Sequence, residues 1–322
     1  MREKFTGCLM GLAAGDALGA AVEFLTDSQI RARFGDRGIL EFTAWRGFPS
    51  GAYTDDTQMS LATTEGLLEA ARRWKPQSIF DPAPFVYRAY LDWLATQSDP
   101  SQRRAPGHTC LKALESGVMG TIESPINDSK GCGGVMRTAP VGLAFSHSRA
   151  FHEGARFASI THGHPSGYLS AGFLSEMISH LRQETPLEDA VALSRQTLLQ
   201  YPGYEETEAK ISQAERLAAG GAEPQVAIKH LGDGWVGEEA LGIALYCALV
   251  YEDDFCEGVR AAVNHSGDSD STGSITGALL GALLGENAIP PGWCSQLENT
   301  EGLRRAAEDL FVMFRENPSA GD

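Results

Sequence analysis

Apolar side chains recur every three to four residues along most of the chain, a spacing typical of amphipathic α-helices. In the first segment Phe5, Leu9, Leu12 and Asp16 share one helical face, and the glycines and alanines between them would let a neighbouring helix approach closely. The same periodicity predicts further helices over residues 57–73, 84–97, 107–117, 149–161, 166–183, 187–200, 205–219, 237–251, 254–264, 271–285 and 301–315.

Signals for β-strands are sparse, and residues 38–43 form the one short candidate. Residues 99–106 and 120–130 read as loops, but no linker-like stretch or shift in composition divides the chain. We therefore predict an all-α protein with a single domain over residues 1–322.

The excess of acidic over basic residues limits which kinds of molecule the protein is expected to bind. The chain carries 26 Lys and Arg against 42 Asp and Glu, a formal net charge of −16. Nucleic-acid grooves and anionic membrane surfaces both require basic patches, so we expect neither as a partner. A small anionic ligand remains compatible with this charge, because bound divalent metals would reverse the local field.

Cysteine usage and the N-terminus both favour the cytoplasm. The six cysteines show no Cys-x-x-Cys pair, which favours buried, reduced thiols over disulfides or a zinc site. Residues 1–22 superficially resemble a signal peptide, but Asp16 interrupts the apolar run and Glu3 dilutes the basic start. We expect a buried first helix instead, in a cytoplasmic monomer.

Two acidic motifs carry the strongest chemical signal. Residues 54–57 read Thr-Asp-Asp-Thr and residues 267–272 read Gly-Asp-Ser-Asp-Ser-Thr. Carboxylates this close repel each other unless a cation lies between them. An all-oxygen donor set suits Mg²⁺ or Mn²⁺ and not zinc. The alternative for each motif alone is helix N-capping, and the second motif lacks the glycine and glutamate of an EF-hand.

Further candidates each have an ordinary alternative. Glu23 ends the first helix and could be a surface residue, whereas Asp16 could support a site or a helix contact. Residues 129–137 (Ser-Lys-Gly-Cys-Gly-Gly-Val-Met-Arg) could cradle a phosphate or form a flexible loop, and they match neither a Walker nor a Rossmann motif. His162 could contact a ligand or belong to a helix-terminal turn.

The order of these motifs resembles the ADP-ribosylglycohydrolase family. Residues 7–19 followed by Glu23-Phe24, then residues 54–57, 131–140, 161–162 and 267–273, follow that family's order, and the resemblance spans residues 5–285. It implies a compact orthogonal helical domain with two Mg²⁺ or Mn²⁺ ions. It implies catalytic roles for Glu23, Asp56 and Asp268. The metal ligands it implies are Thr54, Asp55, Asp56, Asp268, Asp270 and Ser271.

The resemblance also implies a substrate site and a reaction. Loops around Gly107 and over residues 129–134 would hold the diphosphate and distal ribose, and His162 the adenosine part. The substrate-binding residues are then Glu23, Gly107, Ser129, Lys130, Gly131, Cys132, Gly133 and His162. Two residues, Cys132 and His108, depart from the family pattern. Both lie where the substrate would be recognised, so they leave open which group is linked to ADP-ribose.

The implied reaction is hydrolysis of the glycosidic bond at C1″ of ADP-ribose, which passes through oxocarbenium character. Two metal ions would hold the ribose hydroxyls and activate water. We expect an ADP-ribosylated protein as substrate, linked first of all through arginine, and free ADP-ribose as product. Serine, nucleic-acid or small-metabolite linkages, a non-catalytic ADP-ribose sensor and a phosphohydrolase releasing AMP are the alternatives.

Overall fold

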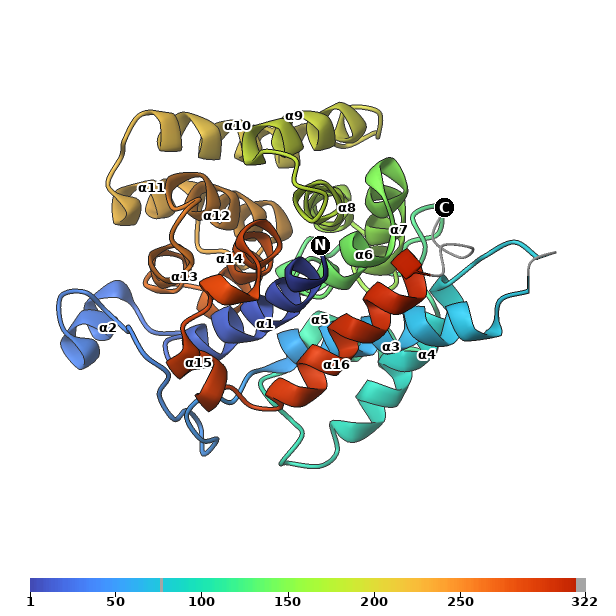
Figure 1. Ribbon diagram of the computed structural model, residues 1–322, viewed down its shortest axis with the longest axis horizontal. Coiled ribbons are helices and arrows are strands. Elements are labelled where there is room, and N and C mark those ends of the chain that lie inside the picture. The colour runs from blue at the N-terminus through green and yellow to red at the C-terminus, as the bar shows by residue number, and fades with distance from the viewer. Residues whose placement is uncertain (76–77, 317–322) are drawn as a thin grey trace.

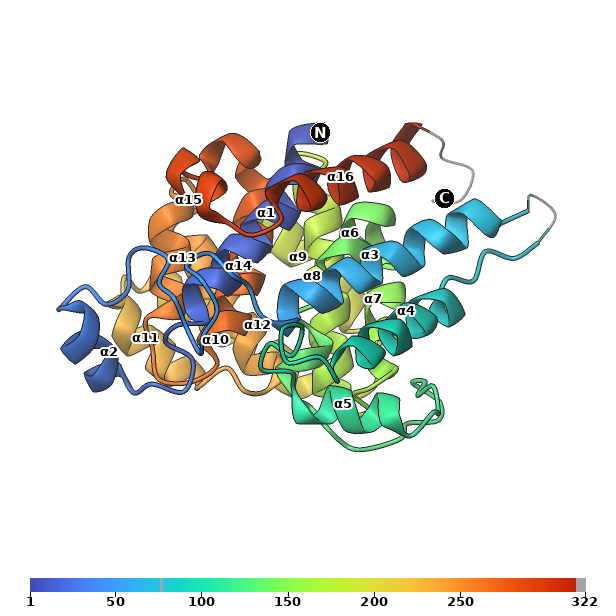
Figure 2. The ribbon, with the colours of Figure 1, turned by 90° about the horizontal axis from the view of Figure 1, so that it is seen from below.

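The computed structural model describes residues 1–75 and 78–316, and this part of the chain contains no β-strand (Figures 1 and 2). The all-α prediction is therefore confirmed. The α-helices are α1 (Arg2–Gly19), α2 (Asp27–Phe34), α3 (Asp55–Arg73), α4 (Ala83–Thr96), α5 (His108–Glu115), α6 (Ala139–Ala144), α7 (His147–Ser159), α8 (Pro165–Leu181), α9 (Leu187–Leu198), α10 (Glu205–Ala219), α11 (Pro224–Leu231), α12 (Gly237–Val250), α13 (Phe255–Val263), α14 (Ser269–Leu284), α15 (Pro291–Gln296) and α16 (Thr300–Phe311). Short helical turns are η1 (Cys132–Gly134), η2 (Glu286–Ala288) and η3 (Val312–Glu316).

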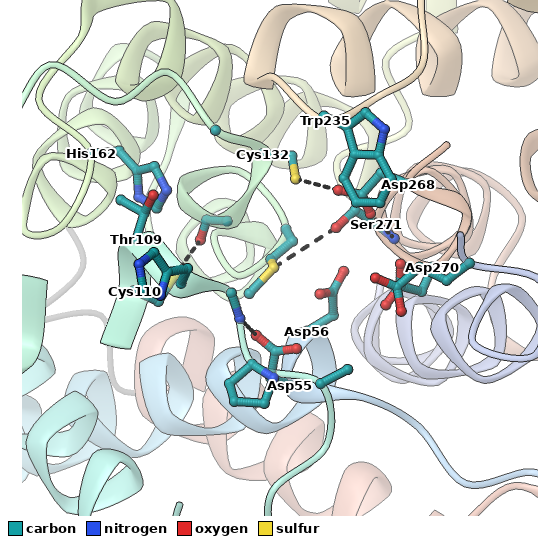
Figure 3. A pocket seen from close by; sticks show the side chains of 18 of the residues that line it. Asp55, Asp56, Thr109, Cys110, Cys132, His162, Trp235, Asp268, Asp270 and Ser271 are labelled. Atoms are coloured by element: carbon teal, nitrogen blue, oxygen red, sulfur yellow. Dashed lines mark hydrogen bonds between the residues drawn. The ribbon is translucent and has the colours of Figure 1, made fainter. Parts of the chain in front are cut away.

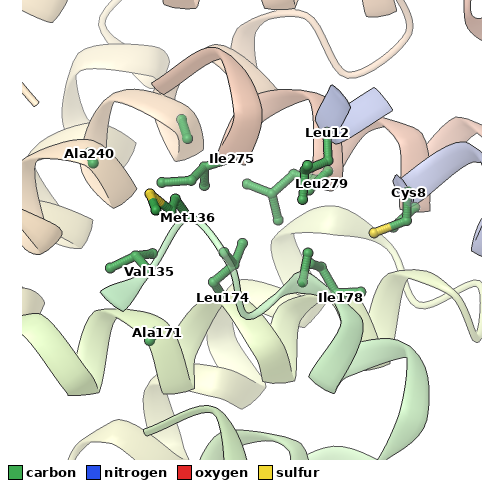
Figure 4. Close-up of a cluster of buried hydrophobic side chains, with 14 of the residues drawn as sticks. Cys8, Leu12, Val135, Met136, Ala171, Leu174, Ile178, Ala240, Ile275 and Leu279 are labelled. Carbon is green, nitrogen blue, oxygen red and sulfur yellow. The ribbon is translucent and has the colours of Figure 1, made fainter. Parts of the chain in front are cut away.

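Four helices form the centre of the molecule. Helices α1, α8, α12 and α14 are buried around nearly their whole circumference, as expected for helices that are apolar or small on every face. Figure 4 shows their side chains meeting around Met136, which follows η1. The remaining helices surround this centre, with α9, α10 and α11 on one side and α3, α4 and α5 on the other (Figure 1).

Helices α1 and α14 approach each other at backbone distance. Glycines spaced four residues apart on α1 face glycines spaced four apart on α14, in the pairs Gly7 with Gly281, Gly11 with Gly277 and Gly15 with Gly273. A Cβ atom added to Gly15 would lie only 1.9 Å from the carbonyl oxygen of Gly273. The expectation that small residues let a helix approach the first segment closely is confirmed.

This contact also joins distant parts of the chain. Helix α1 packs against α14 and α16, so the N-terminal and C-terminal helices of the described chain lie side by side (Figure 2). The first helix is buried, as expected. None of the described helices has both the length and the hydrophobicity that a membrane crossing requires.

The strand predicted at residues 38–43 is wrong. Gly38 at its start has a φ of +69°, and the backbone that follows pairs with a side chain instead of another strand. The Ile39 N–H donates to Asn264 Oδ1 at 2.8 Å, and Asn264 Nδ2 donates to the Ile39 carbonyl at 2.9 Å. One asparagine thus satisfies the backbone groups that a sheet would otherwise occupy.

Helices α2, α6, α11 and α15 lie outside the ranges predicted from periodicity. In α2 only Ile30 is buried, so no apolar stripe marks it. Its start is fixed locally by a capping box, in which Thr26 and Gln29 each satisfy a backbone N–H of the other. Helices α3 and α14 begin two residues earlier than predicted, at Asp55 and Ser269, which places acidic residues in their first turns.

Candidate active site

The two acidic motifs lie side by side at the starts of α3 and α14 (Figure 3). They border a pocket of about 320 Å³. Glu23 lies at the same place, in the turn that follows α1, because α1 ends at Gly19 and not at Glu23 as predicted. The acidic residues that line the pocket are Glu23, Asp55, Asp56, Asp268 and Asp270, together with the neighbouring Ser271. The fold therefore brings together residues that are up to 248 positions apart in sequence (271 − 23).

Part of each motif does cap its helix. Thr54 Oγ1 accepts from the Asp56 N–H at 3.2 Å, and Asp268 Oδ1 accepts from the Ser271 N–H at 3.3 Å. Thr54 is fully buried and does not line the pocket. Capping thus accounts for Thr54 and for one oxygen of Asp268, but not for the other three aspartates.

Asp16 fixes the start of α3 from α1. Its Oδ1 accepts from the Thr54 N–H at 2.9 Å. Its Oδ2 accepts from the Thr57 N–H at 3.0 Å and from Thr57 Oγ1 at 2.6 Å. These bonds satisfy backbone donors that a helix start leaves free. Asp16 therefore both packs α1 against α3 and orients the first acidic motif.

Three carboxylate oxygens in this cluster are buried without a hydrogen-bond partner in the described residues: Glu23 Oε2, Asp56 Oδ2 and Asp270 Oδ1. A buried, unpaired carboxylate oxygen is costly, so each requires a proton or a cation. Asp55 differs, because its Oδ2 accepts from the Gly107 N–H at 3.2 Å. That bond places Gly107 beside the acidic cluster.

The electrostatics of the acidic cluster also require a proton or a cation. Burial raises the pKa of Asp55, Asp56 and Asp268 well above the usual range, and the charge of Asp270 raises it further. Burial raises the pKa of Glu23 to about 11, with Asp270 and Asp268 adding to the shift. Protonation is one way to relieve this repulsion, and a divalent cation is the other.

The donor chemistry fits a hard cation. Residues 1–75 and 78–316 hold no group of three or more His, Cys, Asp or Glu side chains already arranged to bind a metal ion. The donors facing the pocket are nevertheless carboxylate and hydroxyl oxygens, which Mg²⁺ and Mn²⁺ prefer. The thiol of Cys132 acts as a hydrogen-bond donor to the acidic cluster, because its Sγ donates to Asp268 Oδ2 at 2.7 Å. Burial raises the pKa of Cys132 above its usual value, which keeps that thiol protonated.

The glycine-rich loop forms the opposite wall. Gly131, Cys132 and Gly133 line the pocket, and so does His162 beside them (Figure 3). A Cβ on Gly133 would come within 3.2 Å of the His162 ring, so the glycine allows close contact between loop and imidazole. Burial, with the nearby Arg137 cation, lowers the pKa of His162 to about 3, and the ring is neutral.

Two predicted substrate residues do not line the pocket. Ser129 lies behind the loop, where its Oγ accepts from the Gly131 N–H at 3.3 Å. Lys130 turns away, and its Nζ donates to Glu238 at 2.6 Å and to Glu206 at 2.9 Å. In this structure both residues support the loop from behind.

Several lining residues were not assigned from the sequence. Thr109 and Cys110 come from the start of α5, next to His108, which the sequence had placed near the substrate, and Met136 follows η1. Trp235 belongs to the segment 233–236 between α11 and α12. Its only sequence signal is a large aromatic residue beside the turn glycine Gly234, whose φ is +81°. Phe24 also lines the pocket, next to Glu23.

Comparison with known proteins agrees with this geometry. The model of the ADP-ribosylglycohydrolase family matches residues 1–320. This chain belongs to the ADP-ribosylglycohydrolase family. The resemblance drawn from the motifs is confirmed, and the family is one of glycosidic-bond hydrolases.

Named relatives of this glycohydrolase cover nearly its whole length. It is 28% identical to the ADP-ribosyl-[dinitrogen reductase] glycohydrolase of Rhodospirillum rubrum, over 97% of each chain. It is 26% identical to the ADP-ribosylarginine hydrolase Tri1 of Serratia proteamaculans, covering 98% of this chain and 80% of Tri1. It is 24% identical to human ADP-ribosylhydrolase ARH3, covering 98% and 94% respectively.

A solved structure shares the fold. An ADP-ribosylglycohydrolase-related protein complex superposes with a TM-score of 0.70 at 26% sequence identity. The match covers 97% of this chain and 98% of that one. The expected compact helical fold of the family is confirmed.

Proposed function

We propose that this glycohydrolase uses two Mg²⁺ or Mn²⁺ ions to cleave the glycosidic bond at C1″ of ADP-ribose, releasing it from modified proteins. The observation that carries the proposal is the set of unpartnered, buried oxygens of Glu23, Asp56 and Asp270 at one end of the pocket. The relatives' names support ADP-ribosyl hydrolysis as the reaction class.

The residues that would hold the ions come from both acidic motifs. Asp55, Asp56, Asp268 and Asp270 would supply the negative charge. Ser271 would add a hydroxyl oxygen from the pocket lining, and Thr54, which is buried next to Asp55, would add its own. When bound, the ions would polarise the ribose hydroxyls and a water molecule. Thr54 and Asp268 already anchor the first turns of their helices, so those two positions are fixed before any ion binds.

Glu23 would act as the acid/base group of the reaction. Its Oε2 is free of other hydrogen bonds and lies beside the acidic cluster, and its pKa of about 11 keeps it protonated while the cluster is uncompensated. Compensation of the neighbouring charges lowers that pKa toward the working range of an acid/base group. Glu23 would then exchange a proton with the leaving group or the attacking water.

The rest of the pocket would hold ADP-ribose. The backbone of Gly131 and Gly133, together with Gly107, would receive the diphosphate and distal ribose, and His162 the adenosine part. A neutral His162 ring suits stacking or hydrogen bonding. Ser129 and Lys130 would act on the substrate through the loop that they hold in place.

Arginine is the linkage we propose, in line with the name of the relative Tri1, an ADP-ribosylarginine hydrolase. The cytoplasmic location, the monomeric state and the single domain over residues 1–322 stay predictions.

The deciding experiment measures release of ADP-ribose from arginine- and serine-modified proteins, with Mg²⁺, with Mn²⁺ and with EDTA, identifying the product by mass. We expect metal-dependent release of intact ADP-ribose. AMP as the product would indicate cleavage of the diphosphate. No release, with metal-dependent binding of ADP-ribose, would contradict hydrolysis of either linkage and favour a sensor.

A matched pair of variants tests the acidic site. Asp268 and Asp254 both cap helices, α14 and α13, through bonds of 3.3 Å and 3.1 Å to backbone N–H groups. Replacing either by Ala should cost about 1 kcal/mol of stability. Only Asp268→Ala should abolish metal-dependent turnover, because Asp254 lies outside the pocket. Equal activity in both variants would refute the assignment of Asp268.

A further inference from the structure

Two large aromatic side chains stand exposed at the acidic end of the pocket. Phe24 is 55% exposed and Trp235 is 39% exposed, although both line the pocket. Their rings stack with centroids 5.1 Å apart and planes inclined by 25°. Leaving this much aromatic surface in water is unfavourable, and such surface at a pocket marks a place where a partner group binds.

The backbone fixes this pair relative to the reacting groups. Phe24 directly follows Glu23 and has a φ of +66°, a strained value for a phenylalanine. The Trp235 carbonyl accepts from the Cys132 N–H at 3.1 Å, in the glycine-rich loop. Two residues earlier, the Asp233 carbonyl accepts from the Asp268 N–H at 2.9 Å. The aromatic pair is thereby tied to the acidic cluster and to the loop.

The Phe24 ring already holds a guanidinium. The Cζ atom of Arg46 lies 4.9 Å from the centroid of that ring. Guanidinium groups stack on aromatic faces because the face of the ring is electron-rich and the cation is planar and weakly hydrated. Arg46 comes from a different segment of this chain, so the contact shows that a guanidinium fits against this aromatic pair. With Arg46 and Trp235 both against the Phe24 ring, the surface left for a further guanidinium is that of Trp235, which Phe24 supports from behind.

We infer that Phe24 and Trp235 receive the guanidinium of an ADP-ribosylated arginine and thereby select the arginine linkage. This inference rests on the proposed function. The bond to be cut would lie at the acidic cluster, so the group beyond it would lie next to Glu23 and Asp268. Phe24 follows Glu23 in the pocket lining, and Trp235 lies beside Asp268 (Figure 3). A serine side chain has neither a positive charge nor a planar face, and it would gain little there.

The test uses two peptides of the same sequence, one ADP-ribosylated on arginine and one on serine. In Phe24→Leu and Trp235→Leu, kcat/KM for the arginine peptide should fall about 3- to 30-fold, through KM, which is the range of a cation–π contact. The serine peptide should change less than twofold. The Kd of free ADP-ribose, which lacks the linked side chain, should stay the same.

Two further variants control for structure. Phe34→Leu is the matched control, because Arg33 Cζ lies 5.0 Å from the Phe34 ring in a similar stack outside the pocket. It should leave every constant unchanged. Trp235→Phe keeps an aromatic face and should retain most of the activity on the arginine peptide. Thermal unfolding confirms that each variant is folded.

The outcomes separate the inference from the function on which it rests. An equal loss on both peptides, or a weaker Kd for ADP-ribose, would overturn the inference, because the pair would then bind ADP-ribose itself. Release by the wild type from the serine peptide alone would also overturn it while hydrolysis stands. Release from neither peptide would refute the proposed function.

Discussion

Replacing Gly15 by alanine should destabilise the protein even though alanine is the better helix former. Gly15 lies in the middle of α1, where it meets Gly273 of α14. A methyl group there would lie 1.9 Å from the Gly273 carbonyl oxygen and 2.3 Å from its carbon. Both atoms belong to the backbone of a buried helix, so neither can rotate away.

The structure sets the size of the effect. Ordinary contact of a Cβ atom begins near 3.4 Å, so the helices must separate by about 3.4 − 1.9 = 1.5 Å at this point. Overpacking of a core costs about 1–3 kcal/mol. The higher helix propensity of alanine returns about 1 kcal/mol. Because the separation also loosens the neighbouring Gly11 contact, we expect a net loss of about 2 kcal/mol.

Urea unfolding in EDTA, followed by circular dichroism, measures this loss. The matched control is Gly242→Ala in α12, also a buried helix, where the nearest atom to an added Cβ is Lys210 Cβ at an ordinary 3.4 Å. In that variant no backbone clash opposes the higher helix propensity of alanine, which should stabilise the protein by up to about 1 kcal/mol. Equal stability of the two variants would refute the reasoning. Gly15→Ala should also weaken Mn²⁺ binding, because Asp16 moves with it.

Two other predictions concern charge. Lys130→Met leaves the buried Glu238 carboxylate without its cation, so it should lower stability by about 2 kcal/mol and weaken ADP-ribose binding. Lys130→Met with Glu238→Gln should restore both, and a persistent binding defect would instead indicate direct contact between Lys130 and the substrate. In metal-free protein burial raises the pKa of Asp16 to about 7, from 3.8, and that of Glu23 to about 11, from 4.5. The folded state then binds more protons than the unfolded chain, so stability should fall as pH rises from about 4, through about 7 for Asp16 and on to about 11 for Glu23. Mg²⁺ or Mn²⁺ should therefore raise Tm more at pH 8 than at pH 5, and an equal rise at both would contradict this account.

Local sequence patterns determined much of the fold. Periodicity gave the central helices because a buried helix repeats its apolar and small residues every turn, whatever its partner. It failed for α2, which has one buried residue. The strand predicted at residues 38–43 is also absent, because the Ile39 backbone groups bond to Asn264, 225 positions along the chain. Composition and spacing also identified both acidic motifs, because crowded carboxylates are informative without knowledge of their neighbours.

Tertiary structure alone decided how those motifs are used. The sequence placed Glu23, Asp55, Asp56, Asp268 and Asp270 as candidates, and the close approach of α1 to α14 gathered them around one pocket. Nothing in the local sequence shows that Lys130 faces away from the pocket, or that Trp235 stacks on Phe24. The direction of a side chain depends on residues a hundred or more positions away, which periodicity and spacing do not encode.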